Sequence, residues 1–263
     1  MEQTVQVILL AILQGIAEFL PISSSGHLVL GQALLGMKEA GITLEVALHA
    51  GTLVSTLIYY RSAILKILNG LLKGCRDAWR MALYILVSSI PAIVFYLLCK
   101  KRVDAAFEDP HVVGCALLFT GVVLTALRWV PNRDALNTFW RAIFIGVAQA
   151  IAILPGVSRS GMTISAARLS GISPEKSAEF SFLASIPLIA GATLKKLLES
   201  LQETPAAAEA TLSPLLLLFG AVISAIVGYF ALAFLVKTLR GRFFWCFGLY
   251  CLLAGCCTIL FAH

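Results

Sequence analysis

Charge is scarce in this sequence. Asp, Glu, Lys and Arg make up 13% of its 263 residues, whereas 59% are hydrophobic. Charged residues account for about 25% of an ordinary soluble domain. The composition therefore argues against a soluble domain and predicts an integral membrane protein.

Three further absences narrow the class. The sequence lacks the alternating pattern and turn signals of β-strands, so we expect an all-α polytopic fold rather than a membrane β-barrel. Its seven cysteines show no CxxC spacing, which favours packing roles over metal or disulfide clusters. The first residues lack a basic leader and a small-residue cleavage site, so we expect no removable signal peptide.

Apolar runs predict the membrane helices, since a bilayer core takes roughly 20 residues to cross. Four runs are long enough: residues 81–99, 112–130, 214–236 and 243–261. Four others are too short or too polar for plain spans and predict broken, re-entrant or bundle-core helices; they are residues 5–20, 46–60, 142–154 and 180–194. We expect residues 1–263 to form a single integral membrane domain.

The distribution of the basic residues among the loops predicts how the chain is oriented in the membrane. The net charge is +6, but the basic residues lie in short loops rather than in one patch, so we expect no nucleic-acid partner. Basic loops stay in the cytoplasm. This rule places loops 61–80, 128–141 and 237–242 inside, and the more acid-balanced loops 104–109 and 199–209 outside.

One polar stretch is repeated. Residues 14–27, QGIAEFLPISSSGH, align with residues 149–162, QAIAILPGVSRSGM, at an offset of 135. The predicted topology gives the two copies, about 5–61 and 140–195, opposite directions. Inverted repeats of this kind bring two broken helices together at one central polar site. Chance similarity between Gly- and Ser-rich apolar helices is the alternative.

The second copy favours an anion. An arginine in an apolar setting is normally retained by an anion or a water-filled cavity, and the guanidinium of Arg159 suits the oxygens of a phosphate. Alternatively, Arg159 is a loop cation or pairs with an acid. Hydroxyl groups and glycines around it would complete a phosphate site with the start of a helix; they are Ser158, Ser160, Thr163, Gly156 and Gly161.

The first copy adds groups that suit catalysis. Glu18 lies one helical turn after Gln14, where it can bind a divalent cation or act as a base. Ser24 can become a nucleophile beside a base, and His27 titrates near neutral pH. The alternatives are a structural carboxylate for Glu18 and a helix cap for His27. Two more polar residues in apolar runs, His49 and Glu179, align at an offset of 130, and either a supporting or a structural role suits them.

These motifs resemble the undecaprenyl-diphosphate phosphatases of the BacA/UppP type. The similarity lies in residues 14–27, in PGVSRSGMT at 155–163 and in FSFLASIP at 180–187, and it extends over most of the chain. The resemblance implies a multi-pass enzyme of the bacterial plasma membrane, with its site on the outer side. It would hydrolyse undecaprenyl diphosphate to undecaprenyl phosphate and inorganic phosphate, which recycles the lipid carrier for cell-wall synthesis and links the family to bacitracin resistance.

The resemblance also implies roles for individual residues. We expect Glu18, Ser24, His27 and Arg159 to be catalytic, with Ser24 attacking phosphorus or with water attacking directly. We expect Mg²⁺ or Ca²⁺ at Glu18 and Gln14, although Gln14 brings no charge where the family carries either Glu or Gln. The phosphate contacts would come from Ser23, Ser25, Ser158, Arg159, Ser160, Gly161 and Thr163.

Another class of function explains the same fold. A secondary transporter or flippase for an anionic or phospholipid substrate also uses inverted repeats and broken helices. It explains less well why Ser24 and His27 lie close to Glu18 in the sequence. A non-catalytic phospholipid-binding protein is a third alternative. The sequence leaves the cation, the lipid groove and a homo-oligomeric state open.

Overall fold

Helices make up the regular structure of the protein. The computed structural model describes residues 3–37, 41–136, 138–200, 212–240 and 243–261. Within these ranges every regular element is a helix. The predicted all-α fold is therefore confirmed.

The first polar stretch is a broken helix. Helix α1 (Gln3–Phe19) ends two residues before Pro21, and α2 (Ser24–Leu34) begins after it. Ser23 caps α2, because its Oγ accepts a hydrogen bond from the Gly26 N–H at 3.4 Å. Ser23 has a positive φ of 72°, and backbone strain of this kind in a non-glycine residue gathers at functional sites.

The second polar stretch is broken in the same way. Helix α7 (Phe139–Ile151) ends before a loop that leads into α8 (Arg159–Leu169). Ser158 caps α8 by accepting a hydrogen bond from the Gly161 N–H at 3.1 Å. Ser23 and Ser158 are aligned in the repeat, so aligned residues make the same cap in both copies.

Longer helices surround the two breaks. Helix α3 (Gly41–Tyr59) follows the first break, and α9 (Pro174–Ser200) follows the second. Helices α10 and α5 pack along them: α10 lies against α1 and α3, and α5 lies against α7 and α9. The remaining elements complete the chain: α4 (Arg61–Leu72), α5 (Arg76–Glu108), α6 (Pro110–Ala126), the short 3-10 helix η1 (Leu127–Trp129), α10 (Pro214–Arg240) and α11 (Cys246–Phe261).

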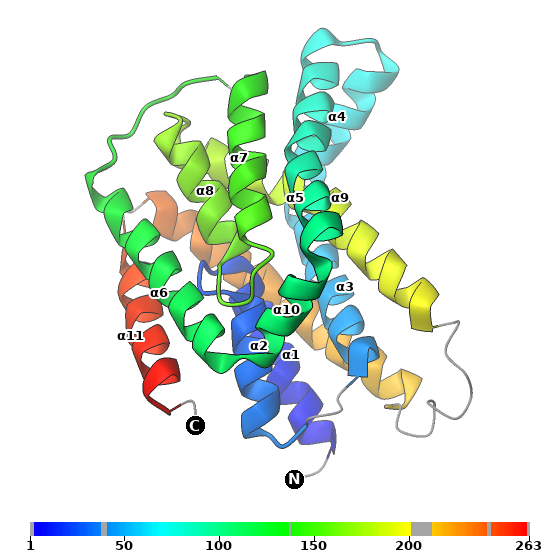
Figure 1. Cartoon of the computed structure of the whole chain (residues 1–263). Helices are drawn as coiled ribbons and strands as arrows, with labels where there is room; N and C mark the ends of the chain where they lie inside the picture. The colour runs from blue at the N-terminus through cyan, green and yellow to red at the C-terminus, as the bar shows by residue number, and fades with distance from the viewer. Residues whose placement is uncertain (1–2, 38–40, 137, 201–211, 241–242, 262–263) are drawn as a thin grey trace.

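The two broken helices enter the molecule from opposite ends. In Figure 1, α1 leads upward from the N-terminus at the bottom, whereas α7 leads downward from the top. Both breaks lie in the interior between these ends. An inverted repeat requires this arrangement, and the repeat over residues 5–61 and 140–195 stays a prediction.

By length and composition, the described residues include four helices that are long and apolar enough to cross a membrane: Arg76–Glu108, Pro110–Trp129, Pro174–Lys195 and Pro214–Arg240. Three of them match the predicted spans 81–99, 112–130 and 214–236, the second of which ends one residue beyond its helix. The prediction that residues 180–194 are too short or too polar for a plain span is wrong, because α9 begins at Pro174 and its residues Pro174–Lys195 are long and apolar enough to cross a membrane, with Pro187 inside the helix. Proline is tolerated in a membrane helix when neighbouring groups satisfy the backbone.

Two other predicted boundaries need correction. The run 243–261 forms α11, which begins only at Cys246 and has 16 residues, so it falls short of a full span. The stretch 61–80 is not an open loop, because α4 and the start of α5 form a helical pair there. Much of the predicted loop 199–209 lies outside the described residues.

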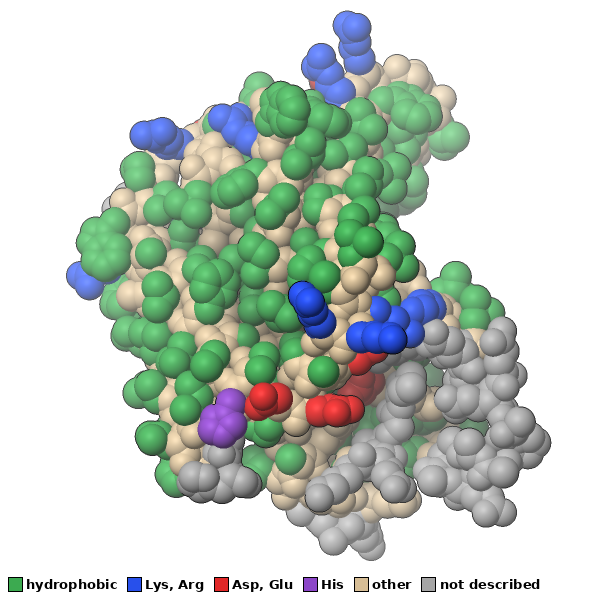
Figure 2. Space-filling view, viewed as in Figure 1, with side chains coloured by type: hydrophobic (Ala, Val, Ile, Leu, Met, Phe, Trp, Pro, Cys, Tyr) green, Lys and Arg blue, Asp and Glu red, His purple; other side chains and the backbone are tan. Residues whose placement is uncertain are grey.

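The surface matches a protein that contacts lipid. Figure 2 shows hydrophobic side chains over the middle of one face, with Lys and Arg side chains along its upper edge and a mixed charged group lower down. Large apolar side chains on α5 and α10 are exposed, such as Leu98 at 79% and Phe230 at 67%. In water so many exposed apolar groups would drive association; in a bilayer they face lipid.

Candidate active site

The two helix breaks meet. A Cβ added to Gly26 would lie 3.2 Å from the Cα of Gly156, so the two backbones are in close contact. Ser160 donates a hydrogen bond to the carbonyl oxygen of Leu20 at 3.4 Å. The predicted meeting of the two polar stretches, 135 residues apart, is therefore confirmed.

Glu18 is the centre of this contact. Its Oε2 accepts hydrogen bonds from Ser24 Oγ at 2.7 Å and from Gln14 Nε2 at 3.1 Å. Its Oε1 accepts one from the guanidinium of Arg159, in a short ion pair. His49 Nε2 lies 3.7 Å from Oε2. One carboxylate thus joins groups from α1, α2, α3 and α8.

Arg159 is mostly buried at the first position of α8. Its side chain is 17% exposed and that of Glu18 is 5% exposed. The other terminal nitrogen of Arg159, NH1, is buried and has no hydrogen-bond partner among the described residues. A buried donor of this kind is costly unless a ligand or water satisfies it. The guanidinium therefore has donors left for an incoming anion.

The hydroxyl groups around Arg159 are partly occupied. Thr163 donates to the carbonyl oxygen of Arg159 at 2.8 Å and also contacts Ser181 on α9. Ser158 lies 3.3 Å from Ser160, oxygen to oxygen, while it caps α8. In the first break, Ser23 and Ser25 are 3.4 Å apart. Ser158, Gly161 and Thr163 thus make contacts that shape the turn, and their contacts to phosphate stay predictions.

His27 has partners other than Ser24. Its Nδ1 lies 2.8 Å from the carbonyl oxygen of Ser23, and its Nε2 lies 2.7 Å from the hydroxyl oxygen of Tyr250 on α11. The hydroxyl of Ser24 donates to Glu18 instead. The base closest to Ser24 is therefore a carboxylate rather than an imidazole.

Comparison with known proteins gives the family. The profile described as bacitracin resistance protein BacA matches residues 7–257. This chain belongs to the BacA family. The BacA relatives include undecaprenyl-diphosphatases from Desulfatibacillum aliphaticivorans (39% identical, covering 98% of both chains), Pelotomaculum thermopropionicum (38% identical, covering 98% of this chain and 96% of the relative) and Korarchaeum cryptofilum (36% identical, covering 95% and 96%).

Two residues at this site, His49 and Tyr250, are not among the predicted catalytic and phosphate-binding residues. His49 stands out in the sequence as a polar residue in an apolar run, and in the structure its ring lies next to the Glu18 carboxylate. The sequence does not identify Tyr250 as a site residue, because a tyrosine in an apolar helix is common. Only the folded position of α11 shows that it contacts His27.

The predicted divalent cation at Gln14 and Glu18 stays a prediction. Gln14 Oε1 is buried and has no hydrogen-bond partner within the described part of the chain. The described residues contain no group of three or more His, Cys, Asp and Glu side chains placed for a metal ion. Mg²⁺ is commonly bound by one or two protein oxygens together with substrate phosphates, and Gln14 with Glu18 fits that pattern.

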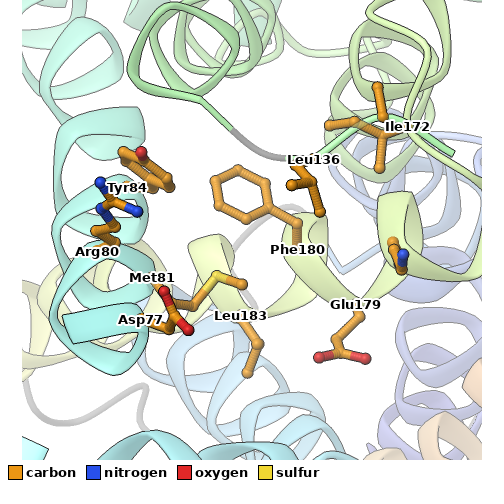
Figure 3. Close-up of a pocket in the computed structure, with 11 residues that line it drawn as sticks. Asp77, Arg80, Met81, Tyr84, Leu136, Ile172, Glu179, Phe180 and Leu183 are labelled. Atoms are coloured by element: carbon orange, nitrogen blue, oxygen red, sulfur yellow. The ribbon is translucent and has the colours of Figure 1, made fainter. Parts of the chain in front are cut away.

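A separate cavity lies between α5 and α9. It has a volume of about 380 Å³, and Figure 3 shows Arg80, Tyr84, Phe180 and Glu179 around it. Glu179 aligns with His49 in the repeat, but it lines this cavity and is not in contact with Glu18. The residues that surround Glu18 do not line the cavity, so the cavity is separate from the polar group at the two helix breaks.

Proposed function

We propose that this BacA-family chain hydrolyses undecaprenyl diphosphate to undecaprenyl phosphate and inorganic phosphate. The observation that carries the proposal is the contact of Ser24 and Arg159 with one carboxylate, Glu18, inside an apolar molecule. A nucleophile, a base and a phosphate-binding cation are thereby within one site. The names of the relatives support the same substrate.

Arg159 binds the terminal phosphate. Its ion pair with Glu18 opens when the more highly charged diphosphate arrives, and the unpartnered NH1 gives a second donor for phosphoryl oxygens. Charge that develops on these oxygens during transfer is stabilised in place, which is the largest catalytic contribution in many enzymes. Ser23, Ser25 and Ser160 lie on the same two breaks and supply neutral donors.

Ser24 attacks the terminal phosphorus. Glu18, which already accepts the Ser24 hydrogen bond at 2.7 Å, takes the hydroxyl proton as the new oxygen–phosphorus bond forms. The bond to the bridging oxygen breaks, and undecaprenyl phosphate leaves with the electron pair. Water then attacks the phosphorus of the phosphoserine while His27 accepts a proton from the water; the bond between Ser24 Oγ and phosphorus breaks, Glu18 returns its proton to Ser24 Oγ, and inorganic phosphate leaves.

Gln14 Oε1 and Glu18 would hold a divalent cation, Mg²⁺ or Ca²⁺. Such an ion neutralises charge on the diphosphate. The chain itself contributes the buried amide oxygen and the carboxylate; the substrate contributes the remaining oxygens.

The site works at the outer side of the bacterial plasma membrane, with α4 and the α6–α7 connection on the cytoplasmic side. Support comes from the basic residues of loops 61–80 and 128–141. The polyprenyl tail stays in an apolar groove between helices and open to the bilayer.

Phosphate release by the purified protein tests the function. Wild type in detergent, given undecaprenyl diphosphate and a divalent cation, releases phosphate, whereas Glu18→Ala, His27→Ala and Arg159→Ala release far less. Arg102→Ala, at the exposed end of α5, is the matched control and keeps wild-type turnover. No release by wild type would overturn the proposal and leave lipid transport as the better explanation.

A labelled intermediate separates the two chemical routes. Rapid quenching with substrate labelled in the terminal phosphate, followed by mass spectrometry, should find phosphoserine at Ser24. Near-normal turnover by Ser24→Ala would rule out the serine route and favour direct attack by water.

A further inference from the structure

The two ring nitrogens of His27 have different partners. Nδ1 lies 2.8 Å from the carbonyl oxygen of Ser23. A carbonyl oxygen only accepts hydrogen bonds, so Nδ1 carries the hydrogen. In a neutral ring Nε2 is then the acceptor, and the Tyr250 hydroxyl 2.7 Å away is its donor.

Tyr250 also fixes the plane of the ring. The rings of His27 and Tyr250 are stacked, with centroids 5.6 Å apart and an angle of 20° between the planes. The next residue, Cys251, is buried and donates from its Sγ to the carbonyl oxygen of Pro21 at 3.4 Å. Helix α11 is thereby attached to the same helix break that carries Ser24 and His27.

We propose that Tyr250 is a positioning residue for His27, an inference that rests on the proposed function. A tyrosine hydroxyl can donate or accept. It donates to Nε2 while His27 is neutral, and it accepts from Nε2–H once His27 has taken up a proton. Tyr250 therefore holds one ring orientation through both protonation states.

Through Tyr250, helix α11 thus contributes a positioning residue to the proposed active site. Ser24 and His27 are three residues apart on α2 and therefore neighbours on its surface. Without the hydroxyl of Tyr250, Nε2 of His27 loses its hydrogen-bond partner, and the ring is held less firmly in its orientation. We expect the proton-transfer step to suffer while substrate binding does not.

The test combines kinetics with nitrogen spectroscopy. Protein labelled with ¹⁵N in its four histidine rings is studied by NMR, and His27→Asn assigns the His27 signals. Wild type should show Nδ1 protonated and Nε2 hydrogen-bonded, and Tyr250→Phe should shift the Nε2 signal. Turnover by Tyr250→Phe should fall about tenfold at unchanged KM, less than the roughly 100-fold expected from losing a general acid–base group.

Tyr229→Phe is the matched control. Tyr229 lies on α10, where its ring packs on Tyr59 and Phe230, so its loss should change neither the spectrum nor kcat. A neutral wild-type His27 ring that carries its hydrogen on Nε2 rather than on Nδ1 would overturn the proposal. Unchanged kcat in a folded Tyr250→Phe would also overturn it. Failure of wild type to release phosphate would instead remove the proposed function, while the spectrum still reports on the contact.

Discussion

Glu18 links the two halves of the chain through its two oxygens. Oε1 contacts Arg159 and Oε2 accepts from Ser24 and Gln14. A buried arginine is stabilised by such a partner, and removing one member of a buried pair leaves an uncompensated charge that costs about 3–5 kcal/mol. The carboxylate therefore holds the two halves together before substrate binds, and the proposed mechanism gives it a chemical role afterwards.

Replacing Arg159 by Lys keeps the charge and removes the planar fork of donors. We expect phosphate release to fall by about 10²-fold, because an ammonium cannot make the paired contacts of a guanidinium. The measurement is kcat/KM in detergent, beside Arg102→Lys at the exposed end of α5. Turnover close to wild type would show that charge alone suffices.

Replacing Gln14 by Glu adds a second carboxylate beside Glu18, at the position where the buried amide oxygen has no partner. Two neighbouring carboxylates repel unless a cation lies between them. We expect the Mg²⁺ concentration for half-maximal activity to fall, and activity in chelator to fall as well. The exposed substitution Gln3→Glu adds the same charge elsewhere, and an identical cation response in both variants would argue against a cation at Gln14.

At the scale of elements, the second break depends on Gly156. Its φ is +91°, and an added Cβ would lie 2.3 Å from the carbonyl oxygen of Val113 on α6. Gly36 also has a positive φ, +68°, but an added Cβ there meets nothing within 4 Å.

These two glycines make a matched pair. We expect Gly36→Ala to cost only the backbone strain, about 1–2 kcal/mol. Gly156→Ala should lower the unfolding temperature further and also reduce phosphate release, because α8 and Arg159 must shift. Equal effects of the two variants on both measurements would contradict this account.

Helices α6 and α11 approach closely through glycines. An added Cβ on Gly121 would lie 2.9 Å from the carbonyl oxygen of Gly248, and one on Gly114 would lie 3.2 Å from that of Gly255. Small residues allow close backbone contact between helices in a membrane. The same contact sets the position of α11 and thus of Tyr250.

A leucine at Gly121 should therefore separate the two helices. Overpacking costs about 1–3 kcal/mol, so we expect a lower unfolding temperature in detergent. Gly191 on α9 is the control, since an added Cβ there meets nothing within 4 Å. An unfolding temperature that falls as much for Gly191→Leu would locate the effect in leucine itself rather than in the α6–α11 contact.

Across the whole molecule, the charge pattern predicts which end faces the cytoplasm. Cys75 is exposed in the turn between α4 and α5. Ala105 is exposed near the other end of α5. In intact cells, an impermeant maleimide should label Ala105→Cys and miss Cys75, each as a single cysteine. The opposite labelling would reverse the orientation of the site.

Much of this arrangement could be predicted from the sequence. Proline and glycine between apolar runs predict both breaks, whereas the caps that Ser23 and Ser158 make at the starts of α2 and α8 come from the structure. The sequence repeat alone predicts that Arg159 lies close to the first polar stretch, residues 14–27. These features are local or repeated, so a sequence carries them.

The remaining features depend on packing. Helix α9 is longer than its apolar run of residues 180–194, because it begins at Pro174 and continues to Ser200. The contact between Tyr250 and His27 spans 223 residues and follows from the glycine contacts that place α11. The choice of Glu18 rather than His27 as the partner of Ser24 depends on side-chain direction, which spacing along a helix does not fix.

The ion pair between Arg159 and Glu18 also affects how tightly the product, inorganic phosphate, binds. A free phosphate ion can contact both terminal nitrogens of Arg159 only by displacing a carboxylate that is already in place and loses no translational freedom. The released phosphate therefore competes with the Glu18 carboxylate for Arg159. The substrate has the additional binding energy of its lipid tail. We expect weak inhibition by inorganic phosphate, so turnover should continue where the product accumulates.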